Sequence, residues 1–261
     1  MDLLVVSKQD PASSAMGDYL VKKYPFRENN GMLTRDNFVL TYIDKIHLNY
    51  DNININADFP DVKIDRVIFL SKHSSSADIK SLTVHATGNY GENKLGGYEK
   101  TLSVSDPEMM TQSLRILKQS YRGEKFSVTF ESTHHGPYLD VPNYYIEIGT
   151  TEEEWQDPEA LSAVTEAVMR NHGNNYPNYV GIGGGHYSPK ITEYVLENNV
   201  NIGHILSKHD HETADESIIR QAVQKTPRCR GFIMDKKGSR SGVREIVRSI
   251  SEADSLELIV I

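Results

Sequence analysis

Short runs of apolar and β-branched residues alternate along the chain with segments in which apolar residues recur at helical spacing. Runs of about four to eight such residues between polar or glycine-rich stretches are typical of buried strands. The pattern predicts ten strands, at residues 3–7, 38–43, 67–70, 82–85, 126–131, 144–148, 179–182, 202–206, 231–234 and 256–261.

Three of the intervening segments carry helix-start signals, each with a proline in the first turn. The signals are S-D-P-E at 105–108, D-P-E at 157–159 and S-P-K at 188–190, and they precede predicted helices at 109–121, 160–170 and 191–197. Strands that alternate with such helices predict an α/β fold with a mixed, mostly parallel central sheet flanked by helices.

The chain has 261 residues, of which 38% are hydrophobic, and this is enough for a sizeable core. We expect a single α/β domain over residues 1–261. The stretch 49–65 is polar and rich in Asn and Asp, which favours a surface loop over a linker.

The single cysteine, Cys229, allows no intramolecular disulfide and favours a reducing compartment. The apolar start of the chain has no basic segment of the kind that signal peptides carry. No apolar run approaches the roughly 20 residues of a membrane helix. We therefore expect a soluble, cytoplasmic protein.

The net charge of −8 argues at first against a nucleic-acid partner. The charge is unevenly distributed, however, because residues 220–248 carry +7 and the rest of the chain −15. A basic stripe on an acidic body can contact phosphates locally, although a solvated face of two helices would look the same. The nine basic residues are Arg220, Lys225, Arg228, Arg230, Lys236, Lys237, Arg240, Arg244 and Arg248.

Histidine recurs at or just after predicted strands in five segments that are distant in sequence. Because carboxyl ends of parallel strands meet at one rim of a sheet, we expect these imidazoles to converge. Imidazole can bind zinc or transfer protons near neutral pH. Short metal motifs such as H-E-x-x-H are absent, so spacing does not identify ligands. The histidines are His73, His85, His134 with His135, His186 and His204.

His134 and His135 would point to opposite faces of a regular strand. Gly136 and Pro137 follow at once, and the pleat is expected to end there. Two arrangements remain open. Either both imidazoles reach the rim, or one faces the site while the other anchors the core.

The segment G-I-G-G-G-H-Y-S-P-K at 181–190 joins a strand to a helix start through three glycines. Such a turn can present backbone amides to an anion or a developing oxyanion. The alternative is that the segment forms a tight turn between strand and helix and binds no ligand. The segment lacks the G-x-x-x-x-G-K-[ST] pattern of a P-loop.

The segment I-E-I-G-T-T-E-E-E-W at 146–155 holds Glu147 within an apolar strand, where a carboxylate needs a partner. Glu147 is therefore a candidate to orient a histidine or a metal ligand. Thr150 with Glu153 reads as a capping box, so residues 152–154 are expected to be cap and solvated face.

Covalent catalysis is not indicated, because the chain has no G-x-S-x-G motif and Cys229 has no histidine near it in sequence. An activated water, with histidine or a metal lowering its pKa, fits the composition of the strand ends better.

Seven blocks, in this order, resemble the archaeal-type D-aminoacyl-tRNA deacylases, a family with plant relatives. The resemblance spans roughly residues 67–240, and the blocks are S-K-H-S-S, T-V-H-A-T-G-N, S-T-H-H-G-P, E-I-G-T-T-E-E-E-W, G-I-G-G-G-H-Y-S-P-K, G-H-I-L-S-K and K-G-S-R-S-G. It implies hydrolysis of the ester between a D-amino acid and tRNA, which keeps D-residues out of protein synthesis. It also implies zinc dependence and a core similar to those of peptidyl-tRNA hydrolase and phosphorylase-like domains.

The resemblance also implies a site region. The expected catalytic residues are His134, His135, His186, Glu147 and Thr133. The expected zinc ligands come from His73, His85, His134, His186 and His204. The expected substrate-binding residues are Gly183, Gly184, Gly185, Lys190, Lys208 and Asn89. The charge of the basic segment adds Lys236, Lys237 and Arg240, which are expected to contact tRNA phosphates. Residues 209–212 fall outside the matching blocks and are expected to form a solvated loop.

Two other functions would use some of the same features. A zinc-dependent amidohydrolase or peptidase for small substrates would use the histidines but not the basic segment. A tRNA-binding module without catalysis would use the basic segment but not the histidines. We expect a monomer with a D-aminoacyl-tRNA substrate, no membrane partner and no obligate protein partner.

Overall fold

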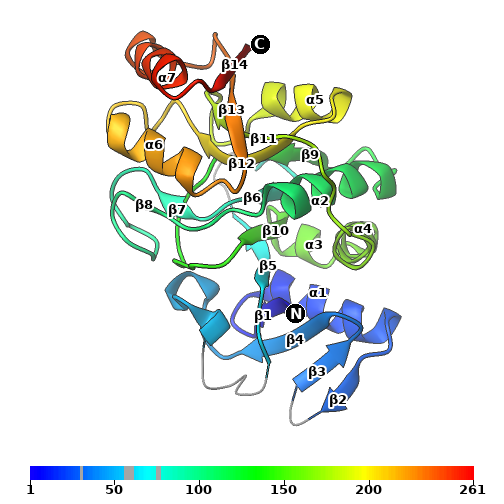
Figure 1. Ribbon diagram of the computed structural model, residues 1–261. Coiled ribbons are helices and arrows are strands. Elements are labelled where there is room, and N and C mark those ends of the chain that lie inside the picture. The colour runs from blue at the N-terminus through cyan, green and yellow to red at the C-terminus, as the bar shows by residue number, and fades with distance from the viewer. Residues whose placement is uncertain (30–31, 56–61, 75–77) are drawn as a thin grey trace.

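The computed structural model describes residues 1–29, 32–55, 62–74 and 78–261. An eight-stranded sheet with the strand order β2-β3-β4-β1-β5-β10-β6-β9 forms the larger part of the fold (Figure 1). Its strands are β1 (Asp2–Ser7), β2 (Arg27–Asn29), β3 (Met32–Arg35), β4 (Phe38–Ile43), β5 (Arg66–His73), β6 (Ser81–His85), β9 (Ser127–Phe130) and β10 (Asn143–Gly149).

The direction of the strands in this sheet is mixed, as the alternation of elements predicted. Strands β4, β1, β5 and β10 are parallel to one another, and β9 is parallel to β6. Strand β6 is antiparallel to β10, and the β2–β3 and β3–β4 pairs are also antiparallel. The reversal at β6 decides how the site is assembled.

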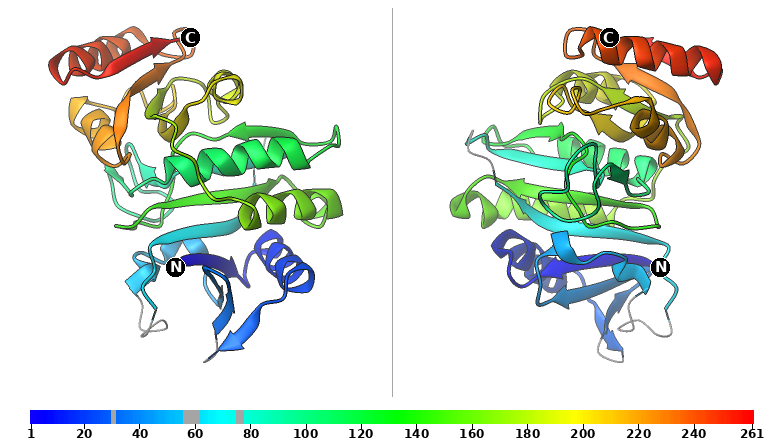
Figure 2. Two further views of the ribbon diagram at one scale, coloured as in Figure 1. Left: turned by 45° about the vertical axis from the view of Figure 1, so that its right-hand side comes forward. Right: turned by 90° about the vertical axis from the view of Figure 1, so that its left-hand side faces the viewer.

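A second sheet contains four parallel strands in the order β12-β11-β13-β14. It lies at the C-terminal end of the molecule, away from β1–β4 (Figures 1 and 2). Its elements are β11 (Asn178–Ile182), α5 (Pro189–Glu197), β12 (Asn201–Leu206), α6 (Glu216–Gln224), β13 (Cys229–Met234), α7 (Ser241–Ala253) and β14 (Glu257–Val260). A two-stranded ribbon pairs β7 (Gly88–Asn89) with β8 (Thr101–Leu102).

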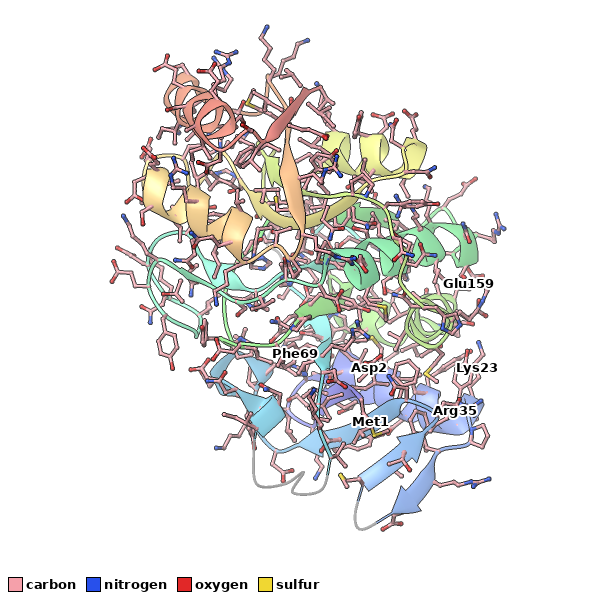
Figure 3. The ribbon with its side chains drawn as sticks, in the orientation of Figure 1. Met1, Asp2, Lys23, Arg35, Phe69 and Glu159 are labelled. Carbon is pink, nitrogen blue, oxygen red and sulfur yellow. The ribbon has the colours of Figure 1, made fainter. Side chains whose placement is uncertain are left out.

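Helices α1 (Pro11–Lys23), α2 (Pro107–Ser120), α3 (Glu152–Trp155) and α4 (Pro158–Met169) complete the fold. Helix α2 contacts β6 of the first sheet and β12 of the second, so it joins the two. Helices α1 and α4 also lie side by side, and Lys23 at the end of α1 pairs with Glu166 of α4 at 3.3 Å (Figure 3). At the start of α2, Asp106 accepts a hydrogen bond from the Met109 N–H group, as expected of an N-cap.

The two faces of the central strands differ in character. Even-numbered residues such as Leu70, Ile146 and Val84 are fully buried in the apolar core with α2 and α4. Odd-numbered residues face the other way because side chains alternate along a strand. Near the middle of the sheet, this second face carries histidine and glutamate.

All ten predicted strands and all three predicted helices are present, and β2, β3, β7 and β8 were not predicted. The predicted capping box is off by one residue, because the N-cap of α3 is Thr151, which pairs with Glu154, and not Thr150 with Glu153. Glu154 is buried, contrary to the prediction, and Lys80 and Lys125 lie 3.0 Å and 3.3 Å from its carboxylate. Of the predicted loop at 49–65, residues 56–61 lie outside the described residues, and the part before them includes a 3₁₀ turn, Ile53–Ile55.

No helix within the described ranges has the length and apolar character that crossing a membrane requires.

Candidate active site

The centre of the candidate site is a group of side chains on one face of β5, β10 and β6. Glu147 of β10 stands opposite Ser71 and Thr83 of the neighbouring strands. Its Oε2 atom lies 3.5 Å from His73 Nδ1 on one side and 3.7 Å from His85 Nε2 on the other. The predicted convergence is therefore confirmed for His73 and His85, with Glu147 between them.

The physical reason for the convergence differs from the prediction. His73 ends β5 and His85 ends β6, but β6 runs antiparallel to β10, to which β5 is parallel. The two strand ends thus lie at opposite ends of this patch, opposite Gly149 and Tyr145 of β10 respectively. The site is built across the face of the sheet and not along one rim.

Glu131 is the functional residue that sequence reasoning missed. It follows β9 directly and is 1% exposed. One carboxylate oxygen, Oε1, lies 3.0 Å from His73 Nδ1, and the other, Oε2, lies 3.0 Å from His186 Nε2. These contacts do not have hydrogen-bond geometry, and apart from imidazole nitrogens neither oxygen has a polar partner in the described part of the chain, which is unusual for a buried carboxylate.

A signal for Glu131 was present in the sequence. The residue ends the apolar run V-T-F-E and precedes His134 by three positions. His134 Nε2 lies 3.6 Å from Glu131 Oε2, so this spacing brings the two side chains together once the strand ends.

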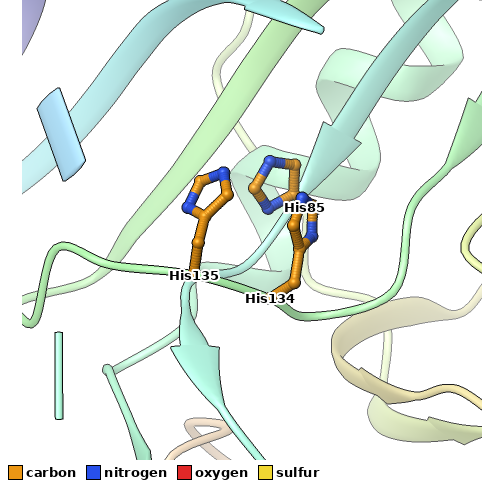
Figure 4. Close-up of side chains that lie close together, drawn as sticks. All are labelled: His85, His134 and His135. Atoms are coloured by element: carbon orange, nitrogen blue, oxygen red, sulfur yellow. The ribbon is translucent and has the colours of Figure 1, made fainter. Parts of the chain in front are cut away.

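Both members of the histidine pair face the site, which settles the alternative left open by the sequence. The His134 and His135 ring centroids are 4.3 Å apart, and each ring lies within 5 Å of the His85 ring (Figure 4). His135 has a φ of 46°, a left-handed conformation that interrupts the strand pleat. The broken pleat is what allows two consecutive side chains to share one site.

His85, His134 and His135 also share one hydrogen-bonding pattern at the ring nitrogens. Their Nδ1 atoms lie 3.1, 2.8 and 2.6 Å from the backbone carbonyl oxygens of Ala86, Ser132 and Gly136, in that order. A carbonyl only accepts, so Nδ1 carries the proton in each ring and Nε2 is the remaining ligand atom. Metal-binding histidines commonly donate one ring N–H to a carbonyl in this way.

The pKa values of the clustered histidines and glutamates depend strongly on one another. Burial opposes a charge on His73, but its close contacts with Glu131 and Glu147 outweigh burial and raise the pKa of His73 to about 11. The imidazoles in turn hold the pKa of Glu131 well below its ordinary value and that of Glu147 at about 2, against the effect of burial. Both carboxylates are therefore ionised at neutral pH.

The pKa values of His134 and His135 shift in the opposite direction, downward. Desolvation and the neighbouring His85 lower the pKa of His134 well below its ordinary value and that of His135 to about 3. For His85 itself, contacts with Glu147 outweigh burial, and its pKa is raised. His134 and His135 are thus neutral at pH 7 and hold lone pairs that a metal ion or a proton can use.

The donors fit a zinc ion, which prefers imidazole nitrogen and carboxylate oxygen. The neutral Nε2 atoms of His134 and His135 and the buried Glu131 oxygens supply both types. Donor atoms lie within 4.8 Å of one another in three overlapping sets, namely His85, His134 and His135; His73, Glu131 and His186; and His85, Glu131 and Glu147.

His204 and Thr133 do not join this group. His204 Nδ1 lies 3.2 Å from the Thr133 hydroxyl, and His204 Nε2 lies 3.0 Å from the Ser103 carbonyl oxygen. The Thr133 hydroxyl also accepts a hydrogen bond from the Ile205 N–H group at 3.0 Å. Among the described residues, no set of metal-capable donors includes His204. The structure therefore places these two residues in a contact that joins the two sheets.

The glycine segment does not form the predicted amide nest. The N–H groups of Gly183, Gly184 and Gly185 already donate to the carbonyl groups of Leu206, Gly238 and Tyr187, at 2.8, 3.3 and 3.1 Å. Gly183 instead permits a close approach, because its φ is 102° and a Cβ there would lie 2.9 Å from the Asp235 carbonyl oxygen. The segment positions His186, whose Nε2 reaches Glu131.

A cavity of about 410 Å³ lies beside the histidine pair. It is lined by His134 and His135, by Asn89 and by the loop that follows β7. Asn89 donates from Nδ2 to the carbonyl groups of Gly96 and Tyr98, so it shapes this loop. His209 and Asp210 line the cavity too. The predicted solvated loop at 209–212 holds for the exposed His209 and Glu212, whereas His211 is buried, so the prediction is wrong there.

Several cations of the basic segment, residues 220–248, are paired with carboxylates, so the segment presents less free positive charge than the sequence indicated. Arg220, Lys225, Arg228, Arg230 and Arg240 each pair with a carboxylate. Within the described ranges, no ion pair involves Lys236 or Lys237. Of the predicted substrate-binding cations, Lys190, Lys208 and Lys237 come together beside Gly184, whereas Arg240 pairs with Glu212.

Imidazoles and ionised carboxylates next to a cavity can activate water, so the site has the composition of a hydrolase site, built on a mixed α/β fold. The sequence model of the family described as D-aminoacyl-tRNA deacylase matches residues 60–259. The chain belongs to this family.

Relatives match over almost the full length. The chain is 51% identical to a D-aminoacyl-tRNA deacylase of Thermoplasma acidophilum over 100% of both chains. It is 32% identical to one of Thermococcus kodakarensis over 99% of both. A crystal structure of a conserved protein of unknown function superposes with a TM-score of 0.92 at 30% identity, covering 100% of this chain and 95% of that one.

Proposed function

We infer that this protein is a D-aminoacyl-tRNA deacylase, which hydrolyses the ester bond between a D-amino acid and tRNA and releases both. Membership in the family supports the reaction. The observation that carries the site is Glu131, a buried carboxylate whose only polar neighbours among the described residues are imidazoles, with His73 and His186 each at 3.0 Å. Neither rival function accounts for both the family match and this group.

Ester hydrolysis needs a base for the attacking water and a proton for the leaving ribose oxygen. We assign the first role to Glu131, which is ionised and touches three histidines. His186 is the member of the group with the most exposed side chain, 39%, and it can pass a proton between Glu131 and substrate. Glu147 holds His73 and His85 in position.

A zinc ion in this site stays a proposal. The Nε2 atoms of His85, His134 and His135 are the donors we propose for it, which leaves Glu131 free to act as the base. When bound, zinc would supply a Lewis acid that lowers the pKa of water. The direct readout is the metal content of the purified protein, measured before and after dialysis against a chelator.

The function is tested by the rate of deacylation of D-tyrosyl-tRNA against L-tyrosyl-tRNA, with and without a chelator. Rapid loss of the D-ester alone is the expected result. If a chelator abolishes this loss and zinc restores it, zinc takes part. If D-selective loss ignores the chelator, the histidines and carboxylates act without it. Failure to hydrolyse either ester contradicts the proposed function.

We also propose that the enzyme works in the cytoplasm as a monomer. The monomer and the single-domain organisation of residues 1–261 stay predictions, and sedimentation velocity and limited proteolysis would test them.

A further inference from the structure

A second cavity, of about 360 Å³, lies on the other side of the glycine segment and has a basic lining. Three lysines line it, from α5, from the loop after β12 and from the loop after β13. These are Lys190, Lys208 and Lys237. The one carboxylate is Asp235, which accepts from the Lys237 N–H group at 3.0 Å and lies 3.5 Å from Lys190 Nζ. Three cations against one anion leave the cavity positively charged.

The N-terminus of α5 opens onto the same cavity, since Ser188, Pro189, Lys190 and Ile191 line it. Pro189 and Lys190 begin this nine-residue helix, and the first-turn amides of Lys190 and Ile191 have no acceptor within the helix. The positive end of the helix dipole therefore adds to the charge of the lysines.

Ser188 supplies an observation independent of charge. It is the N-cap residue and is 1% exposed, yet its side chain makes no capping hydrogen bond. Its hydroxyl has no hydrogen-bond partner at all among the described residues. A buried hydroxyl normally has one. A ligand with acceptor oxygens in this cavity would provide the partner.

The cavity adjoins the catalytic group through Tyr187. This residue lines the cavity, and its hydroxyl lies 2.9 Å from His73 Nε2. The preceding residue, His186, reaches Glu131. An anion bound here is thus separated from the carboxylates of the site by the Tyr187 side chain.

We propose that this cavity binds one backbone phosphate of the acceptor strand of tRNA and so positions the terminal ribose ester at Glu131. The proposal rests on the proposed function. A phosphodiester carries one negative charge and two acceptor oxygens that suit lysines and a helix N-terminus. The acidic remainder of the chain repels a polyanion, which makes a local positive cavity a means of fixing its position.

The first experiment measures binding of uncharged tRNA to the full chain, to the double variant K190Q/K208Q and to S188A. The matched control is K22Q, which removes an exposed lysine on α1 that makes no ion pair among the described residues. We expect the double variant to bind tRNA about tenfold or more weakly than K22Q, and its salt dependence to lose about one unit of slope. Thermal unfolding checks that each variant is folded.

The second experiment compares kcat/KM for D-tyrosyl-tRNA with that for D-tyrosyl-adenosine, which has the ester but no phosphate. We expect the loss caused by K190Q/K208Q or by S188A to be about tenfold larger on the tRNA ester than on the adenosine ester. The same ratio should be near one for K22Q.

The outcomes separate the two proposals. Equal tRNA affinity and equal substrate ratios in K190Q/K208Q and K22Q would overturn the phosphate site. Weaker tRNA binding by a protein that hydrolyses no D-ester would keep the phosphate site and contradict the deacylase function. Binding of inorganic phosphate that is lost in the double variant, with unchanged tRNA affinity, would assign the cavity to a free anion and overturn the tRNA assignment.

Discussion

The histidines of the active-site group and His204 differ in how many of their ring nitrogens have hydrogen-bond partners. At His204 both nitrogens have partners, since one contacts the Thr133 hydroxyl and the other the Ser103 carbonyl. In His134 and His135 only Nδ1 contacts a carbonyl, and Nε2 belongs to a set of donors shared with His85. A polar group with complete partners stabilises the fold, and one with incomplete partners indicates chemistry.

Two buried carboxylates, Asp106 and Glu131, differ in their partners in the same way. Asp106 caps α2 and pairs with Arg66 at 2.7 Å, so its burial is compensated by structural contacts. Glu131 is buried to a similar degree and has only imidazoles near it. The difference points to a group that is held ready for a ligand or a proton, at some cost in stability.

The strongest test of this distinction is Glu131→Gln. The amide keeps the shape of the side chain but removes its charge and its basicity. We expect kcat for D-tyrosyl-tRNA to fall about 10³-fold because the base is lost. Thermal unfolding checks that the variant is folded, since Glu131 also lies 3.0 Å from His73 and His186. Single-turnover assays measure the rate, and His204→Gln is the control. Wild-type activity in the Glu131→Gln variant would remove Glu131 from the mechanism.

The next test is His135→Gln. We expect about a 10²-fold loss of activity and a fall in bound zinc, because one neutral Nε2 donor is lost from its set. Metal analysis after dialysis gives the zinc content independently of activity. Equal zinc content in His135→Gln and His204→Gln would refute the contrast between the two kinds of histidine as far as metal is concerned.

The pH dependence of stability tests the structural histidines. Burial lowers the pKa of His204 and of His47 to about 4, below the value near 6.5 of the unfolded chain. Below pH 6.5 the unfolded state binds protons that the folded state does not. Stability from these two residues is therefore complete above pH 6.5 and declines as the pH falls toward 4. Between pH 6.5 and 5 each should lose on the order of 2 kcal/mol.

Urea unfolding at pH 7 and at pH 5 measures this loss. Other groups titrate in the same range, so the informative quantity is the difference between wild type and His204→Gln. The variant should lose less stability between the two pH values than the wild type. An equal loss would show that His204 does not remain neutral in the folded state.

The smallest expected effect is that of His204→Gln at pH 7. Glutamine has a donor and an acceptor but cannot reach both Thr133 and Ser103 in the geometry of the ring. We expect a loss of about 1 kcal/mol in the free energy of unfolding and unchanged kcat per folded molecule. A large loss of kcat with intact stability would place His204 in the chemistry after all.

Much of the fold could be predicted because its signals are local. The alternation in β5, β10 and β6 and the prolines at the starts of α2, α4 and α5 depend only on neighbouring residues. The direction of β6 could not be predicted, since β6 pairs with β10, a strand that follows much later in the chain. The short strands β2, β3, β7 and β8 were missed because few residues carry their pattern.

The same limit explains the errors in the site. Histidines at strand ends could be selected one by one, but His204 looked like the others until its partners were known. Glu131 looked like the polar end of a strand, because its three imidazole neighbours come from β5, from its own loop and from the glycine segment. The glycines suggested free amides, but their acceptors lie in segments that are distant in sequence.

The amino-acid sequence by itself determined the alternating elements, the α/β class, the family motifs and the set of imidazoles from which the site is drawn. Only the tertiary structure decided which of those imidazoles meet, and it did so through Glu131 and Glu147 and through the reversal of β6. The physical reason is that secondary structure follows from interactions between neighbours in sequence, whereas pKa shifts and ligand sets follow from distances of about 3–4 Å between segments that the chain brings together.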